Sequence, residues 1–245
     1  MSRVRFTISK QKFFHNGNLL LPLLVDRANN RLEEAIVNWL GQEYEILDKP
    51  HETKRRSWLG YDAGNINTVL KSTMRTAIIG MHAETHVEYN GLIQKTIKGF
   101  DFALYDEEYN YRIIRNYFIG DPGVIYGDYK IIQIYKDLRL SRDEWLQKIN
   151  DIGGNPGENV EAEKSCLTIV GEIQLGNWAL AEHDVLRVND LKGVDYYIYI
   201  TPTGNLQDKL SDGIVTFDKI CNVLKTKETK IPTWVIGIEA TPITD

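Results

Sequence analysis

Glu172 and Gln174 are polar residues at the end of a strongly apolar stretch, and their types and spacing could support chemistry. They alternate with Ile173, and a break at Gly176-Asn177 follows them. Residues two apart on a strand point to the same face, so this carboxylate and this amide would lie next to each other. The apolar residues before them predict a buried strand whose end presents both groups.

Two further carboxylates, Glu161 and Glu163, come just before this strand, and a loop or hairpin return could bring one of them beside Glu172. Carboxylate oxygens, the main-chain carbonyl of Ile173 and water form the all-oxygen environment that Mg²⁺ prefers. Such an ion can lower the pKa of a bound water and stabilise charge on a phosphoryl oxygen. Gln174 would then orient water or substrate.

The same acidic residues have other interpretations. Acidic residues before a strand are usually a solvated turn, and a polar pair at a strand end is usually its exposed face. A carboxylate pair also suits glycoside hydrolysis, in which two acids flank the scissile bond, and the 13 tyrosines would supply stacking surfaces. Spacing alone leaves a solvated surface and a carbohydrate-active hydrolase open beside the metal site.

The elements that must position these residues follow from hydrophobic periodicity and turn signals. In residues 1–150 the pattern predicts a strand, two helices, a region of short β-rich segments and a short helix after a capping box. These elements are Arg3–Ile8, Asn29–Glu43, Ile66–His82, Val87–Tyr135 and the helix that starts at Ser141–Glu144. The β-rich region includes the segments YRIIRNYFI at 111–119 and YKIIQIY at 129–135.

Residues 151–245 begin with a loop rich in Gly, Pro and Asn and then alternate between strands and helices. The predicted elements are Cys166–Leu175, Asn177–Val188, Val194–Ile200, Thr216–Lys225 and the final strand TWVIGIEA at 233–240. This β-α-β-α-β order has helices of crossover length, so part of the sheet should be parallel. The fold class we predict is α/β, with one mixed β-sheet flanked by helices.

Composition is that of a folded globular chain, with 245 residues of which 42% are hydrophobic. No apolar run approaches the ~20 residues of a membrane span, and the first residues lack the apolar core of a secretion signal. Cys166 and Cys221 sit in apolar patterns, which predicts two buried thiols in a reducing cytoplasm and no zinc site. The net charge of −5 does not exclude a nucleic-acid partner, because phosphate contact depends on local clusters such as Lys54–Arg56.

Three blocks of residues in the last third of the chain form an ordered pattern. Glu163 lies nine positions before Glu172-Ile173-Gln174, and the pattern continues with LGNW at 175–178, Asp184, SDGIVTFDKICNVL at 211–224 and IPTWVIGIEATP at 231–242. This set resembles the type II restriction endonucleases of the PD-(D/E)XK superfamily. It is most similar to the BglII/BstYI-like branch, in which Glu-x-Gln replaces the more usual motif ending in lysine and the sites are built on GATC.

The resemblance implies a Mg²⁺-dependent endonuclease that hydrolyses phosphodiester bonds in double-stranded DNA at a short palindromic site. It also implies a homodimer, since two-fold symmetric subunits meet the two equivalent phosphates of a palindrome. We further expect a cytoplasmic, prokaryotic protein without a membrane partner and with a cognate DNA methyltransferase in the same system. The chain would be a single domain, 1–245, with a helical and β-rich part at 1–150 and the catalytic and recognition core at 151–245.

The resemblance also assigns roles to residues. Glu163, Glu172 and the Ile173 carbonyl would hold the metal, with Glu161 as an alternative, and Gln174 would stand in for the usual lysine near the attacking water. The predicted DNA contacts are base readout by Asn177 and by the loop Ser211, Asp212 and Gly213, phosphate contact by Lys54, Arg55 and Arg56, and His183 on the helix after the motif.

Two departures from the family pattern matter for this reading. The first acid of the family is Asp, and here it is Glu163, so Asp128 or Asp151 could also be the first ligand. Because Gln174 replaces the lysine, the site lacks a cation near the scissile phosphate. A non-cleaving DNA-binding protein on the same fold is therefore the alternative function.

Overall fold

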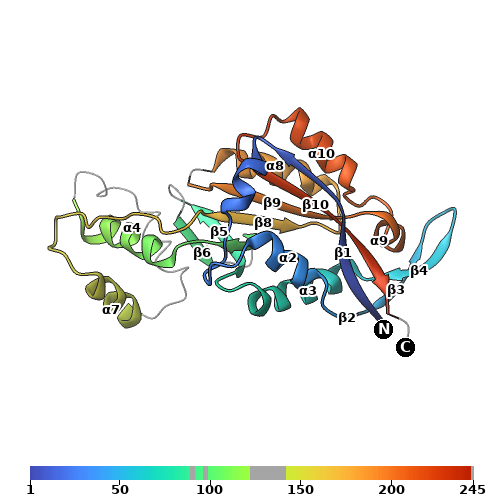
Figure 1. Cartoon of the computed structure of the whole chain (residues 1–245), viewed down its shortest axis with the longest axis horizontal. Helices are drawn as coiled ribbons and strands as arrows, with labels where there is room; N and C mark the ends of the chain where they lie inside the picture. The colour runs from blue at the N-terminus through green and yellow to red at the C-terminus, as the bar shows by residue number, and fades with distance from the viewer. Residues whose placement is uncertain (89–91, 96–98, 122–141, 192, 244–245) are drawn as a thin grey trace.

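A mixed β-sheet forms the centre of the protein, which is described here from a computed structural model (Figure 1). The structure describes residues 1–88, 92–95, 99–121, 142–191 and 193–243. Within these residues eight strands pair in the order β2-β1-β10-β9-β8-β7-β5-β6. Their bounds are β1 Ser2–Phe14, β2 Tyr44–Ile46, β5 His82–Glu88, β6 Leu92–Lys95, β7 Phe100–Leu104, β8 Ile169–Ile173, β9 Tyr196–Pro202 and β10 Thr233–Pro242.

The central strands β8, β9 and β10 are parallel, and the other neighbours in the sheet pair antiparallel. Helices α8 (Ala179–Asp190) and α10 (Phe217–Thr226) connect the parallel strands, with the short α9 (Gly204–Lys209) before α10. The order confirms the predicted β-α-β-α-β arrangement and the α/β class with a mixed sheet. Parallel strands need such crossovers because the chain must return to the starting edge of the sheet before the next strand begins, which a tight turn cannot do.

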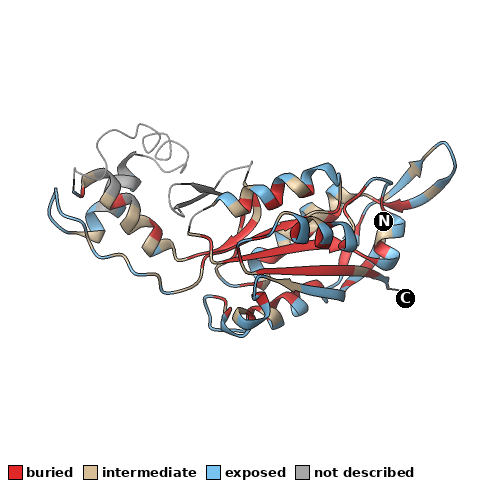
Figure 2. Cartoon of the chain, turned by 90° about the horizontal axis from the view of Figure 1, so that it is seen from above, coloured by how far each residue is buried: buried red, intermediate tan, exposed pale blue. Residues whose placement is uncertain are grey.

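Helices cover both faces of the sheet, and the buried residues gather between the layers (Figure 2). Helices α2 (Leu32–Leu40) and α3 (Ala63–Ala77) bury Trp39 and Leu70 against one face. Helices α8 and α10 bury Val185 and Ile220 against the other. The central strands β8 and β9 therefore bury side chains on both sides, which explains why β9 reads as an almost continuous run of aromatic and β-branched residues.

Helix α3 begins earlier and ends earlier than its apolar stripe predicts. Asp62 precedes it as N-cap, and the Asp62 carboxylate accepts a hydrogen bond from the Asn65 N–H at 2.9 Å. The helix ends at Ala77, and His82, predicted as its last residue, begins β5 instead. The cap fixes the start of the helix that later supplies residues to the candidate site.

The prediction of β-structure at 111–119 is wrong, because this segment belongs to helix α4, Glu107–Ile119. Its aromatic and β-branched residues favoured a strand, but the Asp106 side chain caps the helix by accepting from the Tyr109 N–H at 3.0 Å. Helix α7 (Arg142–Ile152) agrees with the helix predicted after Ser141. The segment at 129–135 and the alternative ligand Asp128 lie outside the described residues.

The remaining elements are small. Near the N-terminus α1 (Gly17–Leu20) leads into the 3-10 helix η1 (Leu21–Leu23), and strands β3 (Asp48–Glu52) and β4 (Ser57–Tyr61) form a separate hairpin that projects from the body (Figure 1). Residues 1–150 and residues 151–245 both contribute strands to one sheet. The single domain 1–245 stays a prediction.

The two cysteines are free thiols. Cys221 is buried as predicted, but Cys166 is only half-buried, because it precedes β8 and does not lie within it. In the described ranges no helix is both long and apolar enough to cross a membrane.

Candidate active site

Two carboxylates from neighbouring strands, Asp101 on β7 and Glu172 on β8, meet at the end of the strand pair. Phe102 of β7 pairs with Gly171 of β8 in antiparallel register. Asp101, which precedes Phe102, therefore lies beside Glu172, which follows Gly171. A side chain at position 171 would lie 2.1 Å from the Phe102 ring, so glycine is required for the close approach. The Asp101 carboxylate also accepts a hydrogen bond from the Ile173 N–H at 2.8 Å.

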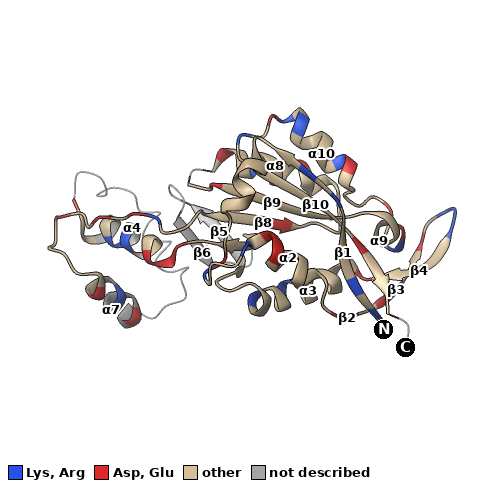
Figure 3. Ribbon diagram, viewed as in Figure 1, with Lys and Arg blue, Asp and Glu red and all other residues tan. Residues whose placement is uncertain are grey.

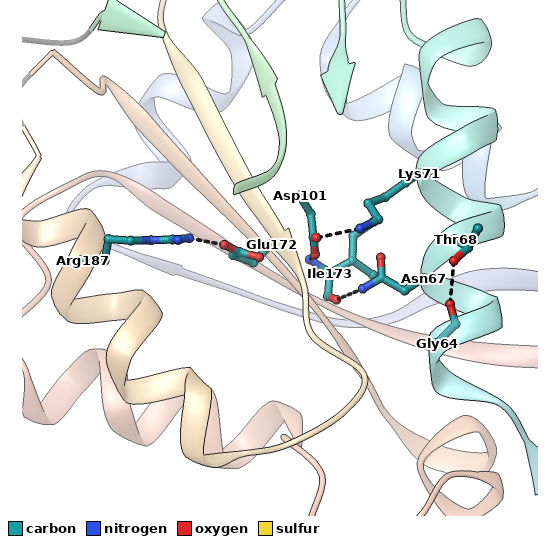
Figure 4. Close-up of polar contacts among 8 residues, drawn as sticks. All are labelled: Gly64, Asn67, Thr68, Lys71, Asp101, Glu172, Ile173 and Arg187. Carbon is teal, nitrogen blue, oxygen red and sulfur yellow. Dashed lines mark hydrogen bonds and ion pairs between the residues drawn. The ribbon is translucent and has the colours of Figure 1, made fainter. Parts of the chain in front are cut away.

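The Asp101 carboxylate, the Ile173 carbonyl and the Glu172 carboxylate each have a hydrogen-bond donor or a cation beside them (Figure 4). Lys71 of α3 lies 3.1 Å from Asp101, measured from Nζ to Oδ1. Asn67, one turn earlier on α3, donates from Nδ2 to the Ile173 carbonyl at 3.2 Å. From the opposite side of the sheet, Arg187 of α8 forms an ion pair with Glu172.

Burial and like charges shape the electrostatics of the cluster. Glu172 is 8% exposed, and its pKa is raised well above its ordinary value by burial and by the nearby Asp101 and Asp184 carboxylates, against the opposing charge of Arg187. Burial likewise raises the pKa of Asp184, although Arg187 and a hydrogen bond from Gln174 work in the other direction. Several carboxylates in a confined space favour a bound cation, because the charged forms are otherwise costly.

The surroundings fit a hydrated divalent metal ion. Tyr197 and Tyr199 project buried hydroxyls without a hydrogen-bond partner in the described part of the chain, and burial raises the pKa of both, so they remain neutral donors near Glu172 and Asp184. Among the described residues no three His, Cys, Asp or Glu side chains form a metal site by themselves. A metal ion at this position would meet the oxygen atoms of two carboxylates and of the Ile173 carbonyl, together with water, which is the oxygen set that suits Mg²⁺.

The structure brings only part of the predicted metal set together. Glu172, Ile173 and Gln174 lie together, and the Gln174 Oε1 accepts from the Gly176 N–H at 3.3 Å. Glu161 and Glu163 are exposed and line a different hollow with residues of α4, among them Arg112, which donates to the Glu161 carbonyl at 3.2 Å.

The alternative first ligand Asp151 is exposed on helix α7 and is likewise not beside Glu172. The residue that stands beside Glu172 is Asp101. The sequence carries one signal for it: a single carboxylate within FDFALY, a segment otherwise made of residues that strands bury.

The predicted base-reading residues form one surface. Asn177 is exposed and its Oδ1 accepts from the Ala179 N–H at 3.0 Å, while its main chain pairs with Ile214. The main-chain N–H of the next residue, Trp178, donates to the Gly213 carbonyl at 3.2 Å. The loop Ser211–Gly213 therefore lies alongside Asn177, and Gly213 has a φ of +81°, a conformation that favours glycine.

The basic cluster at Lys54–Arg56 lies at the tip of the β3–β4 hairpin and is exposed (Figure 3). Arg56 joins the hairpin to the Ser211–Gly213 loop through an ion pair with Asp212 at 3.1 Å, and its guanidinium stacks 4.2 Å from the Trp58 ring centroid. His183 is exposed on α8 and lies 3.7 Å from the Asp184 carboxylate. The predicted DNA contacts thus come from three segments, and the Ser211–Gly213 loop contacts both of the others.

Comparisons with known proteins identify the family. Residues 74–238 match the family described as restriction endonuclease BglII/BglIII. Among solved structures, a crystal structure of the restriction endonuclease BglII in complex with a DNA 16-mer matches 97% of this chain and 76% of its own chain, at 11% identity and a TM-score of 0.45. No curated protein gives a match. Because the family match covers well over half of its residues, the chain belongs to the BglII/BglIII restriction endonuclease family.

Proposed function

We propose that this protein is a Mg²⁺-dependent type II restriction endonuclease that cuts double-stranded DNA at a short palindromic site containing GATC. The observation that carries the proposal is the pairing of Asp101 and Glu172 on adjacent strands next to the Ile173 carbonyl. A buried acidic pair beside a main-chain carbonyl suits a metal ion and a phosphate, whereas a solvated turn would leave its carboxylates exposed.

Asp101, Glu172 and the Ile173 carbonyl would hold Mg²⁺, with Asp101 in the role that the sequence spacing gives to Glu163. When bound, the ion lowers the pKa of a water molecule and stabilises charge on a phosphate oxygen. Gln174 is a neutral amide that cannot take up a proton at neutral pH, so its role is to orient the attacking water through its donor and acceptor atoms.

Recognition is assigned to the three segments that carry the predicted DNA contacts. Asn177 can donate and accept at once, as reading a base edge in the major groove requires, and Ser211–Gly213 flanks it. Lys54–Arg56 supplies phosphate contacts that fix the register of the duplex, and His183 lies on the same helix as Arg187. A homodimer would place one such set on each half of the palindrome, and a cognate methyltransferase would protect the host site.

The experiment compares the wild type with Glu172→Ala on unmethylated phage DNA, with and without Mg²⁺, by gel electrophoresis. We expect discrete fragments only for the wild type with Mg²⁺, because Glu172→Ala removes a metal ligand. The variant should still bind the mapped site in a shift assay. Intact DNA in every lane, with binding retained, would replace the proposal by the non-cleaving DNA-binding protein.

A further inference from the structure

The replacement of lysine by Gln174 leaves the strand of the motif without a cation, but other elements bring two cations to the same carboxylates. Arg187 comes from α8 and Lys71 from α3. Both are largely buried, with side-chain exposures of 23% and 20%. A buried charge is retained only when it is paired, so both residues belong to the cluster electrostatically.

The two cations differ in how firmly they are held. The Arg187 guanidinium lies 3.9 Å from the centroid of the Phe100 ring and is paired with Glu172, so a ring and a carboxylate fix its position. Lys71 reaches Asp101 through a flexible four-carbon stem and ends in a point charge with three donors. An ammonium of this kind can keep its contact with Asp101 while it donates to a phosphate oxygen.

Helix α3 also contacts the site through a second residue, Asn67. Asn67 and Lys71 are four residues apart and therefore share one face of the helix. Asn67 donates to the Ile173 carbonyl and Lys71 pairs with Asp101, so this face contacts two of the three groups assigned to the metal (Figure 4). A lone surface ion pair would involve only one residue of the helix, whereas here two residues of one helical face contact the groups at the strand end.

We propose that Lys71 is the catalytic cation that the Glu172-Ile173-Gln174 motif does not supply, and that its ammonium contacts the scissile phosphate when DNA is bound. The inference rests on the proposed nuclease function and adds a residue to it. A cation supplied by α3 instead of by the strand of the motif would stabilise the same negative charge that develops on the scissile phosphate in the transition state.

The test uses Lys71→Met and Lys71→Arg, with Arg75→Met as the control, since Arg75 is exposed one turn further along α3. With a duplex that carries the mapped site and Mg²⁺, Lys71→Met should lower kcat by ~10²–10³-fold with a much smaller change in KM, the usual cost of losing one transition-state donor. Lys71→Arg should restore part of kcat, because it keeps the charge, and Arg75→Met should match the wild type.

A second readout needs no metal and no cleavage. In Mg²⁺-free buffer the slope of log Kd against log salt concentration should fall by about 1 for Lys71→Met, as for the loss of one phosphate contact. An unchanged slope, even with reduced cleavage, would overturn the inference and leave Lys71 as a structural partner of Asp101. Equal cleavage by wild type and Lys71→Met would also overturn it, whereas a wild type that does not cut would refute the proposed nuclease function instead. If Lys71→Met does not fold, the same slope measured on Lys71→Gln decides.

Discussion

At the scale of single residues, Asp101 and Glu163 make opposite predictions about the first metal ligand. Asp101 stands beside Glu172 and Glu163 does not. Asp101→Asn should therefore reduce the single-turnover cleavage rate by ~10²–10³-fold, because it removes a carboxylate ligand of the ion that stabilises the transition state. Glu163→Gln is the matched control, because it makes the same change of carboxylate to amide, and it should cut at the wild-type rate. Loss of cleavage in Glu163→Gln with normal activity in Asp101→Asn would return the ligand to the position that the sequence spacing indicates.

The same pair explains why the sequence predicts half of the site. Glu172, Ile173 and Gln174 are consecutive, so strand periodicity alone places them. Asp101 meets Glu172 only through pairing of β7 with β8, and between these strands the chain forms α4 and α7. No local spacing records a contact made across such an insertion. Lys71, Asn67 and Arg187 were missed for the same reason, because each reaches the site from a helix that periodicity describes only as amphipathic.

At the scale of elements, the sequence predicts those whose local signals agree and fails where they conflict. The strands and helices after residue 165 have consistent periodicity and appear nearly as predicted. Tyr111–Ile119 is rich in aromatic and β-branched residues, but a capping Asp106 and two first-turn glutamates precede it, and the segment is helical. The cap supplies hydrogen bonds that strand propensity cannot replace, since the first N–H groups of a helix otherwise lack partners.

The N-cap of α3 gives a prediction at this scale, because α3 carries Asn67 and Lys71. The hydrogen bond from the Asn65 N–H lowers the pKa of Asp62 below its ordinary value of 3.8, and a hydrogen bond from the Lys49 side chain lowers it further. Asp62→Ala should cost about 1 kcal/mol, which is ~2–4 °C in Tm for a chain of this size. Asp62→Asn should retain most of the stability, since Asn caps as well as Asp.

The pH dependence of that difference follows from the sign of the shift. A carboxyl group whose pKa is lower in the folded state stabilises the fold above its unfolded pKa, and the stabilisation is lost as the pH falls through the folded value. Thermal unfolding followed by circular dichroism should therefore show the gap between wild type and Asp62→Ala at pH 7 and a smaller gap near pH 3. A gap that widens on acidification would contradict the assigned cap.

At the scale of the whole molecule, the recognition segments lie on one surface although they come from distant parts of the chain. The Arg56–Asp212 ion pair joins the β3–β4 hairpin to the loop beside Asn177. Neither the hairpin nor the loop has a sequence signal for the other, so only the fold shows that they lie side by side. A single set of this kind meets one half of a palindrome, and the two-fold symmetry of the DNA calls for a second.

We therefore expect two chains on each palindromic duplex. Sedimentation of the Glu172→Ala variant with a duplex that carries the mapped site, in Mg²⁺-free buffer, should give a complex containing twice the 28.2 kDa chain mass plus the DNA. A duplex with only one intact half-site serves as the control and should bind more weakly, because the second set of base contacts, each worth ~1–3 kcal/mol, is lost. One chain per intact palindrome at saturation would exclude the symmetric dimer. Each strand would then have to be cut in a separate encounter, and nicked circles would accumulate before linear DNA.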